Sequence, residues 1–290
     1  GVVRNQWDRP ALLARRVSLV VLLPLLCLRV GGEVAISVLT DNHVREESDR
    51  RLADSAKALE EAISRELTGI EHDLSAMRSY RELDEFFQYL DFGRPGDADS
   101  RLVDLEEHYY HVAALKPRCK SFRLYGPDGR ALISIVNQER DYRRHEVGSQ
   151  GWFRKAMDAS REGMGVSAVH ADPVSGEPAL TLYRPVRIKD RVRGVVAVDV
   201  LVQELAGELL KSANVTHDGW SVLLDAGGMV VAAMGPGAPE GRFEDPSVVE
   251  RANAGYASVL TTPGEMRVAF RPQNDTELAV LVSSPHAKIF

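Results

Sequence analysis

One carboxylate stands out in the sequence because of its apolar surroundings. Asp199 interrupts the run "GVVAVDVLV", which has the composition of a buried β-strand. If its side chain faces the interior, leaving the charge unpaired would cost several kcal/mol, and a cationic ligand or a nearby Arg would remove that cost. If strand alternation turns the side chain to solvent, there is no such cost. Asp199 is therefore a candidate binding residue, with an exposed position as the alternative.

Two adjacent aromatic residues mark a second candidate region. Trp152 and Phe153 in "SQGWFRKAMDAS" are neighbours on a predicted helix, so they lie about 100° apart and point different ways. Phe153 is in step with Ala156 and Met157 and fits a core-facing stripe. Trp152 then borders the preceding loop, where its ring could cover a ligand or a ligand's ammonium group. The alternative for Trp152 is ordinary core packing.

The remaining polar candidates are spread along the chain. His170 and Asp172 precede the turn signal in "AVHADPVSGEP" and could reach the mouth of a pocket. Alternation places Tyr183 and Arg184 on opposite faces of a strand, so they cannot both line one pocket. Together with His145, the histidine and aspartate candidates lack the close spacing of a metal site. We therefore expect no metal and no cofactor.

Composition narrows the class of function. The chain has 290 residues, 44% of them hydrophobic and 27% charged, which is enough for about two globular domains. Its net charge is −6 and its Lys and Arg residues are scattered, which argues against a nucleic-acid partner. Cys27 and Cys119 are too far apart for a CxxC site or a disulfide framework. No nucleophile elbow, P-loop or catalytic carboxylate pair is present, so we expect a binding protein rather than an enzyme.

The N-terminal 40 residues resemble a membrane segment. The apolar run "VSLVVLLPLLCL" is shorter than the roughly 20 residues of a spanning helix, but extension through Val38 makes it long enough. The basic pair at 15–16 fits a cytoplasmic start. We expect residues 1–40 to anchor the chain in a membrane, with later residues extracytoplasmic. A cleaved signal peptide is the alternative, and it exports the remainder equally. Because the chain begins without Met and ends abruptly at "SSPHAKIF", we also expect a longer protein.

Residues 41–95 are predicted to form one long helix that ends at "DFGRPGDADS". Apolar residues recur at steps of three and four, which is typical of a helix with one apolar stripe. The stripe could pack on the chain's own globular part, or it could pair with a second copy in a homodimer. The two arrangements can coexist. The stripe consists of Leu52, Ala56, Leu59, Ile63, Leu67, Ile70, Leu74 and Met77.

The rest of the chain contains an internal repeat. β-Rich runs flank a turn at Asp128-Gly129 and again at Gly227-Gly228, as in hairpins. Each hairpin is followed by a short amphipathic helix and then by strands that contain an aromatic-Arg-Pro triplet, a charged turn and a closing apolar run. This order predicts an α+β protein with two tandem modules, residues 96–210 and 211–290, each an antiparallel sheet with helices on one face.

On these motifs the chain resembles the double Cache sensor domains, with two tandem PAS-like modules, of bacterial chemoreceptors, sensor histidine kinases and diguanylate cyclases. The stretch "SFRLYGPDGRALISIVNQERDYRRHEVGSQGWFRKAMDAS" is similar to that family's hairpin and aromatic-led helix, and "GEPALTLYRPVRIKDRVRGVVAVDVLVQEL" is similar to its closing strands. The resemblance implies a ligand-sensing region whose membrane-distal module, residues 96–210, binds a small molecule. Residues 211–290 would form the membrane-proximal module.

The resemblance also implies a ligand site. One subset of the family binds amino acids through a Tyr, an Arg-x-Trp-Tyr motif and a later Asp. Trp152 and Asp199 fall on the Trp and Asp, whereas Phe153 replaces the motif's Tyr, Gln150 replaces its Arg, and His145 stands where the leading Tyr would be. Without that Arg, the fixed fork for a carboxylate is missing.

Four ligand states therefore stay open. They are an amine, an amino acid, an organic acid held by Arg184, or an empty pocket in a module for dimerisation or partner binding. The resemblance favours a sensor that binds a small polar molecule.

Overall fold

The computed structural model describes residues 9–159, 163–172, 175–212, 219–254, 258–262, 266–272 and 278–285. Side chains are not described for residues 9–42, 45, 212, 252–253 and 258–262, and for parts of the last two strands. Contacts divide the chain into two compact units, Arg51–His286, and Gly1–Arg50 with Ala287–Phe290. The predicted membrane segment, residues 1–40, therefore lies outside the residues whose side chains are described. Within the part of the chain that was described, no helix is both long and apolar enough to cross a bilayer.

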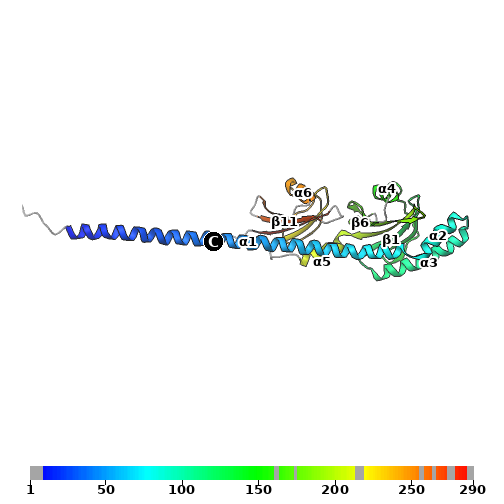
Figure 1. Cartoon of the computed structure of the whole chain (residues 1–290), viewed down its shortest axis with the longest axis horizontal. Helices are drawn as coiled ribbons and strands as arrows, with labels where there is room; N and C mark the ends of the chain where they lie inside the picture. The colour runs from blue at the N-terminus through cyan, green and yellow to red at the C-terminus, as the bar shows by residue number, and fades with distance from the viewer. Residues whose placement is uncertain are drawn as a thin grey trace, which may run out of the picture. The chain divides into compact units, whose positions relative to one another are not determined.

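Three helices precede the first sheet: α1 (Arg9–Arg78), α2 (Arg81–Asp91) and α3 (Pro95–Leu115) (Figure 1). The prediction of one helix over 41–95 is wrong at 79–80, because Tyr80 adopts an extended backbone and ends the helical hydrogen bonding. The predicted break near Pro95 is confirmed. Gly93 has a φ of +67°, a conformation that glycine adopts without strain, and Pro95 then occupies the first turn of α3.

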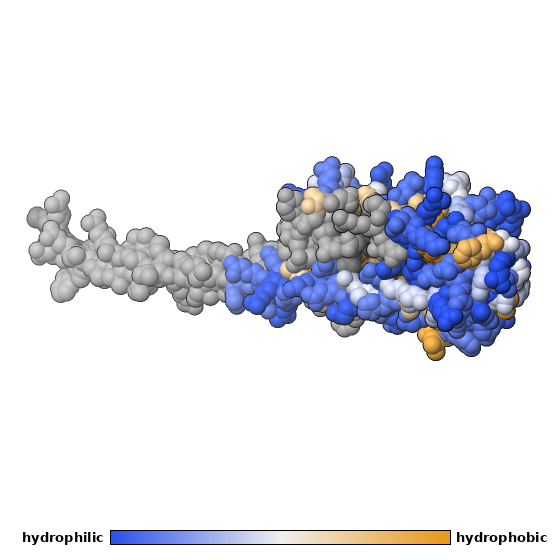
Figure 2. Space-filling model, turned by 45° about the vertical axis from the view of Figure 1, so that its right-hand side comes forward, coloured by the Kyte–Doolittle hydropathy of each residue, from blue (hydrophilic) through white to orange (hydrophobic). Residues whose placement is uncertain are grey.

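The apolar stripe of α1 packs against the chain's own core. All eight predicted positions are at most 8% exposed, and they belong to one cluster with residues from both sheets. The first of the two arrangements, packing on the same chain, is confirmed. On the face drawn in Figure 2, the described surface is mostly hydrophilic, with apolar side chains in small separate groups. A homodimer through the long helix stays a prediction.

The first sheet is antiparallel, with the strand order β3-β2-β1-β7-β6-β4 and β5 also paired to β6. Helix α4 (Gly151–Met157) covers one face, and α1 and α3 pack on the other (Figure 1). The prediction of helices on one face only is wrong here, because apolar residues alternate onto both faces of the central strands. Its strands are β1 (Cys119–Tyr125), β2 (Ala131–Val136), β3 (Glu139–Arg140), β4 (Gly165–Val166), β5 (His170–Ala171), β6 (Pro178–Ile188) and β7 (Arg191–Leu201).

The second sheet repeats the first in its strand order, β10-β11-β12-β8-β9. The strand order β9-β8-β12-β11 corresponds to β2-β1-β7-β6, so the predicted repeat and the α+β class are confirmed. Both predicted hairpin turns have a glycine at positive φ, +80° at Gly129 and +78° at Gly228. Helix α5 (Val202–Ser212), which was not predicted, joins the modules, and α6 (Pro246–Asn253) covers the second sheet. The strands are β8 (Trp220–Leu224), β9 (Val230–Met234), β10 (Ser258–Thr262), β11 (Met266–Pro272) and β12 (Ala279–Pro285).

Candidate ligand site on the first sheet

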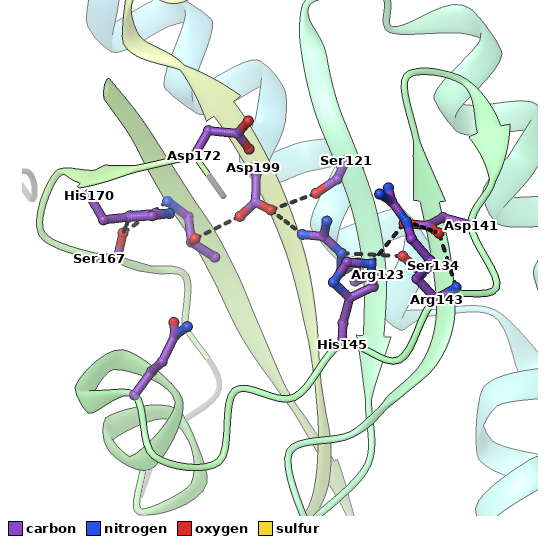
Figure 3. Close-up of polar contacts among 12 residues, drawn as sticks. Ser121, Arg123, Ser134, Asp141, Arg143, His145, Ser167, His170, Asp172 and Asp199 are labelled. Atoms are coloured by element: carbon purple, nitrogen blue, oxygen red, sulfur yellow. Dashed lines mark hydrogen bonds and ion pairs between the residues drawn. The ribbon is translucent and has the colours of Figure 1, made fainter. Parts of the chain in front are cut away.

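Asp199 lies inside the protein, on the sheet face that α4 covers. Its residue is 9% exposed, and its carboxylate accepts hydrogen bonds from the Ser121 and Thr181 hydroxyls, each at 2.7 Å. It also forms an ion pair with Arg123 (Figure 3). Strand register explains the arrangement, since Asp199 on β7 lies directly opposite Ser121 on β1 and Thr181 on β6. The alternative of an exposed Asp199 is wrong.

Arg123 supplies the charge that Asp199 requires. Its guanidinium is buried, and its Nε donates to the Ser134 hydroxyl at 3.3 Å. Burial opposes the charged form, but Asp199 and the Tyr125 hydroxyl outweigh it and raise the pKa of Arg123. Of the two ways to relieve a buried Asp199, a nearby Arg and a cationic ligand, the structure contains the first. The site is therefore a buried ion pair surrounded by hydroxyl groups.

An aromatic group lies beside this pair on the same sheet face. Phe153 is 3% exposed, so its predicted packing role is confirmed. The Trp152 ring is half-buried, with its centroid 5.2 Å from that of Tyr183 and 6.0 Å from that of Tyr125. Its indole Nε1 donates to the Gln150 side chain. Burial raises the pKa of Tyr125 to about 12, so its phenol stays neutral at physiological pH.

Alternation on β6 separates two neighbouring candidates as predicted. Tyr183 belongs to the cluster under α4, and its ring lies so close to Gly165 that a Cβ there would meet it at 2.3 Å. Arg184 points to the other face and donates to the Ser75 hydroxyl of α1 at 2.8 Å. An organic acid held by Arg184 would therefore bind on the opposite side of the sheet, and that alternative is wrong for the sheet face under α4.

The other predicted residues belong to two local clusters on either side of Asp199 (Figure 3). His145 contacts Asp141, with 2.7 Å between Nε2 and the carboxylate. His170 lies 3.3 Å from the Ala168 carbonyl oxygen. Asp172 is buried and accepts hydrogen bonds from the Ser175 backbone and hydroxyl at 2.7 and 2.9 Å, which fixes the turn before β6. These contacts give Asp172 a structural role.

Sequence reasoning missed Arg123, Ser121, Thr181 and Tyr125. The signal was present in "SFRLY", where alternation places Ser121, Arg123 and Tyr125 on one face of the strand. On its own, the run predicts only one strand of a hairpin. The structure brings Gln150, Trp152, Phe153 and Tyr183 together, places Asp199 in the adjoining polar group, and leaves His145, His170 and Asp172 in separate clusters.

Solved structures match the chain over most of its length. An extracellular domain assigned to a histidine kinase, vpHK1S-Z8, is 15% identical, with a TM-score of 0.63 over 84% of this chain and 94% of that one. The sensory domain of the Campylobacter jejuni chemoreceptor Tlp3 with isoleucine bound is 11% identical, with a TM-score of 0.60 over 86% and 96%. The chain has the fold of these sensor domains.

A third match is the sensor domain of the Vibrio cholerae histidine kinase DctB, 12% identical, with a TM-score of 0.58 over 81% of this chain and 96% of that one. No family model matches the sequence, and neither does any curated protein. The predicted double Cache, tandem PAS-like fold is confirmed by these structures, which belong to sensor domains of histidine kinases and chemoreceptors. At this level of identity they establish the fold alone.

Proposed function

We propose that the chain is the extracytoplasmic ligand-sensing region of a bacterial transmembrane signalling receptor and that residues 96–210 bind a small polar molecule. The fold supports the sensing role. The observation that supports a ligand site is the buried pair of Asp199 and Arg123, bordered by hydroxyl groups and by the rings of Trp152 and Tyr183. Such a convergence of few polar groups with aromatic side chains is typical of small-molecule sites.

The pair fits one ligand class better than the others. An amine bound to Asp199 would leave Arg123 buried without its partner. An organic acid bound to Arg123 would leave Asp199 buried without its partner. A zwitterionic amino acid avoids both costs, because its ammonium pairs with Asp199 while its carboxylate pairs with Arg123. Trp152 would then cover the ligand from the α4 side. We therefore infer an α-amino acid, the class that one structurally similar chemoreceptor domain holds.

Signal transmission would start from the strands that carry the pair. A ligand changes the output only if it binds two arrangements of the protein with different affinity. Residues 1–40 would anchor the chain in the inner membrane, and α1 would carry a small shift or rotation toward it within a homodimer. This route has a structural basis in the core cluster, where α1 packs against strands of both modules.

A second candidate function is dimerisation or partner binding without a small ligand. One observation favours it. Asp199 already has Arg123, Ser121 and Thr181 as partners, and Trp152 already rests on Tyr183, so the site is satisfied without a ligand.

Thermal-shift titration of the purified chain with amino acids, amines and organic acids separates the two candidates. An amino acid at 100 times its Kd should stabilise the chain by about 2.7 kcal/mol. The double variant Arg123→Met/Asp199→Leu removes both charges without leaving either unpaired and should abolish the shift. The matched control Asp141→Asn, in the neighbouring cluster, should retain it. Sensing is contradicted if no zwitterion shifts the transition; dimerisation that depends on protein concentration would then support the second candidate.

A further inference from the structure

The second module contains a cavity of about 620 Å³ on the face of its sheet that α6 covers. Trp220 of β8 and Val268 of β11 form the sheet side, and residues 237–246 before and at the start of α6 form the other. The volume falls within the range of about 300–1,000 Å³ that small-molecule sites occupy. We propose that this cavity is a second binding site, for a small organic cation with an apolar body. The proposal does not depend on a ligand in the first module.

A buried hydroxyl beside the cavity has no partner. Ser283 is 2% exposed, and its Oγ makes no hydrogen bond within the described part of the chain. Register places Ser283 directly between Trp220 and Val268, the two sheet residues of the cavity. Ala279 and Leu281 pack under α6, so alternation directs Ser283 to the same face. A buried oxygen without a partner is unfavourable, and a ligand N–H or ammonium would satisfy it.

The repeat shows that this position is a polar one in both modules. Asp199 lies opposite Ser121 in the first sheet, and Ser283 lies opposite Trp220 at the corresponding place in the second. The carboxylate of Asp199 has three protein partners. Ser283 has no counterpart of these, because apolar residues stand at all three partner positions: Val222 for Arg123, Trp220 for Ser121 and Val268 for Thr181. The second module therefore keeps a polar residue at this position, and within the described part of the chain its buried oxygen lies unpaired beside the two sheet residues of the cavity.

The charges around the cavity favour a cation. Glu240, Glu244 and Asp245 line it together with one Arg, Arg242, so its described lining has a net charge of −2. The guanidinium of Arg242 donates to the Gly227 carbonyl at 3.2 Å. The Asp245 carboxylate accepts from the Ser247 backbone and hydroxyl at 3.0 and 2.7 Å. Glu240 and Glu244 are the exposed acidic groups at the mouth, and an anionic ligand would be repelled.

Two aromatic rings complete the cavity. The centroids of Trp220 and Phe243 are 6.2 Å apart, with an angle of 63° between the ring planes. Rings at such an angle form a corner in which an ammonium group can contact an aromatic face while its apolar substituent packs against the other ring. Acidic groups at the mouth, aromatic walls and a free hydroxyl together define the ligand class.

Isothermal titration of the full chain with 2-phenylethylamine tests the proposal, with 3-phenylpropionate as the matched probe of equal body and opposite charge. We expect the amine to bind and the carboxylate not to bind. Phe243→Leu should weaken amine binding by about threefold to thirtyfold, the range of cation–π energies. Glu240→Gln/Glu244→Gln should weaken it too and reduce its dependence on salt. Ser283→Ala should also weaken it.

The variant Arg123→Met/Asp199→Leu changes only the first module and should leave amine binding intact, whatever the fate of amino-acid binding there. Equal affinity for the amine and the carboxylate would overturn the proposal. It would also be overturned if Arg123→Met/Asp199→Leu lost amine binding while Phe243→Leu bound the amine as tightly as the unmodified chain. The two Glu residues are exposed, so their double variant tests the proposal even if Phe243→Leu does not fold.

Discussion

The ion pair between Asp199 and Arg123 decides how single substitutions in the first module behave. Removing one partner leaves the other as an uncompensated buried charge, which costs about 3–5 kcal/mol. Removing both with apolar residues of similar size is often close to neutral. We therefore expect Asp199→Leu and Arg123→Met each to lower the free energy of unfolding by about 3–5 kcal/mol, and the double variant to recover most of that loss. Urea unfolding of the four proteins measures this. Additive losses in the double variant would contradict the pairing.

The cluster around Asp141 gives a pH-dependent contribution to stability. Hydrogen bonds from Arg143, and then from His145, outweigh burial and hold the pKa of the Asp141 carboxyl well below its ordinary value. A carboxyl with a lowered folded-state pKa stabilises the protein above its ordinary pKa, near 4, and that contribution is lost as pH falls through the lowered pKa. We expect Asp141→Asn to destabilise the chain more at pH 6 than at pH 3, as measured by urea unfolding. An equal loss of unfolding free energy in Asp141→Asn at both pH values would contradict this prediction.

The role of a residue could be predicted from the sequence where it depends on the periodicity of a single element, but not where it depends on how two distant strands pair. The packing of Phe153 and the opposite faces of Tyr183 and Arg184 follow from local periodicity, and both predictions are confirmed. The partnership of Asp199 with Arg123 requires the register between β1 and β7, strands separated by more than 60 residues, which local patterns do not specify.

At the scale of elements, the stripe of α1 provides a test of where that helix packs. Ile63 is fully buried in the core cluster of the same chain. Ile63→Ala should therefore lower the free energy of unfolding by about 2–5 kcal/mol through the cavity it leaves. Because the partners belong to the same chain, the loss should not change with protein concentration. Exposed Lys57 on the same helix offers a control, and Lys57→Ala should change stability by less than about 0.5 kcal/mol. A loss that depends on concentration would assign the stripe to a dimer.

Some helices and strands could be predicted from the sequence and others could not. The hairpins were predictable because glycine at positive φ fixes each turn, and α6 because its apolar spacing is local. The end of α1 was not predictable, since nothing in the sequence around Tyr80 breaks a helix, and Arg78 there donates to the Arg187 carbonyl, more than 100 residues away. Helix α5 was not predicted because its first residue, Val202, continues the apolar run of β7, so the pattern there indicates a strand.

For the whole molecule, the predicted division at residue 210 separates two sheets that nevertheless share one core. The cluster along α1 contains Val198 of the first sheet and Val280 of the second. Helix α5 adds a tie, because the Ser221 hydroxyl of β8 donates to the Leu210 carbonyl at 3.0 Å. Each module therefore loses buried apolar contacts if the other unfolds, and the two should unfold together.

Two tryptophans report on this coupling, because Trp152 lies in the first module and Trp220 in the second. The chain has a third tryptophan, Trp7, which is replaced by Phe in both variants so that each keeps one. We expect fluorescence of Trp7→Phe/Trp152→Phe, which retains Trp220, and of Trp7→Phe/Trp220→Phe, which retains Trp152, to give urea midpoints that match those from circular dichroism of the same variant. Coincident transitions are the mark of a single cooperative unit. Replacing Leu223, in the shared core, by Ala should lower both midpoints. If the Trp152 and Trp220 signals changed at separate urea concentrations, the modules would be independent, and a ligand in the first could not shift the second through the α1 core.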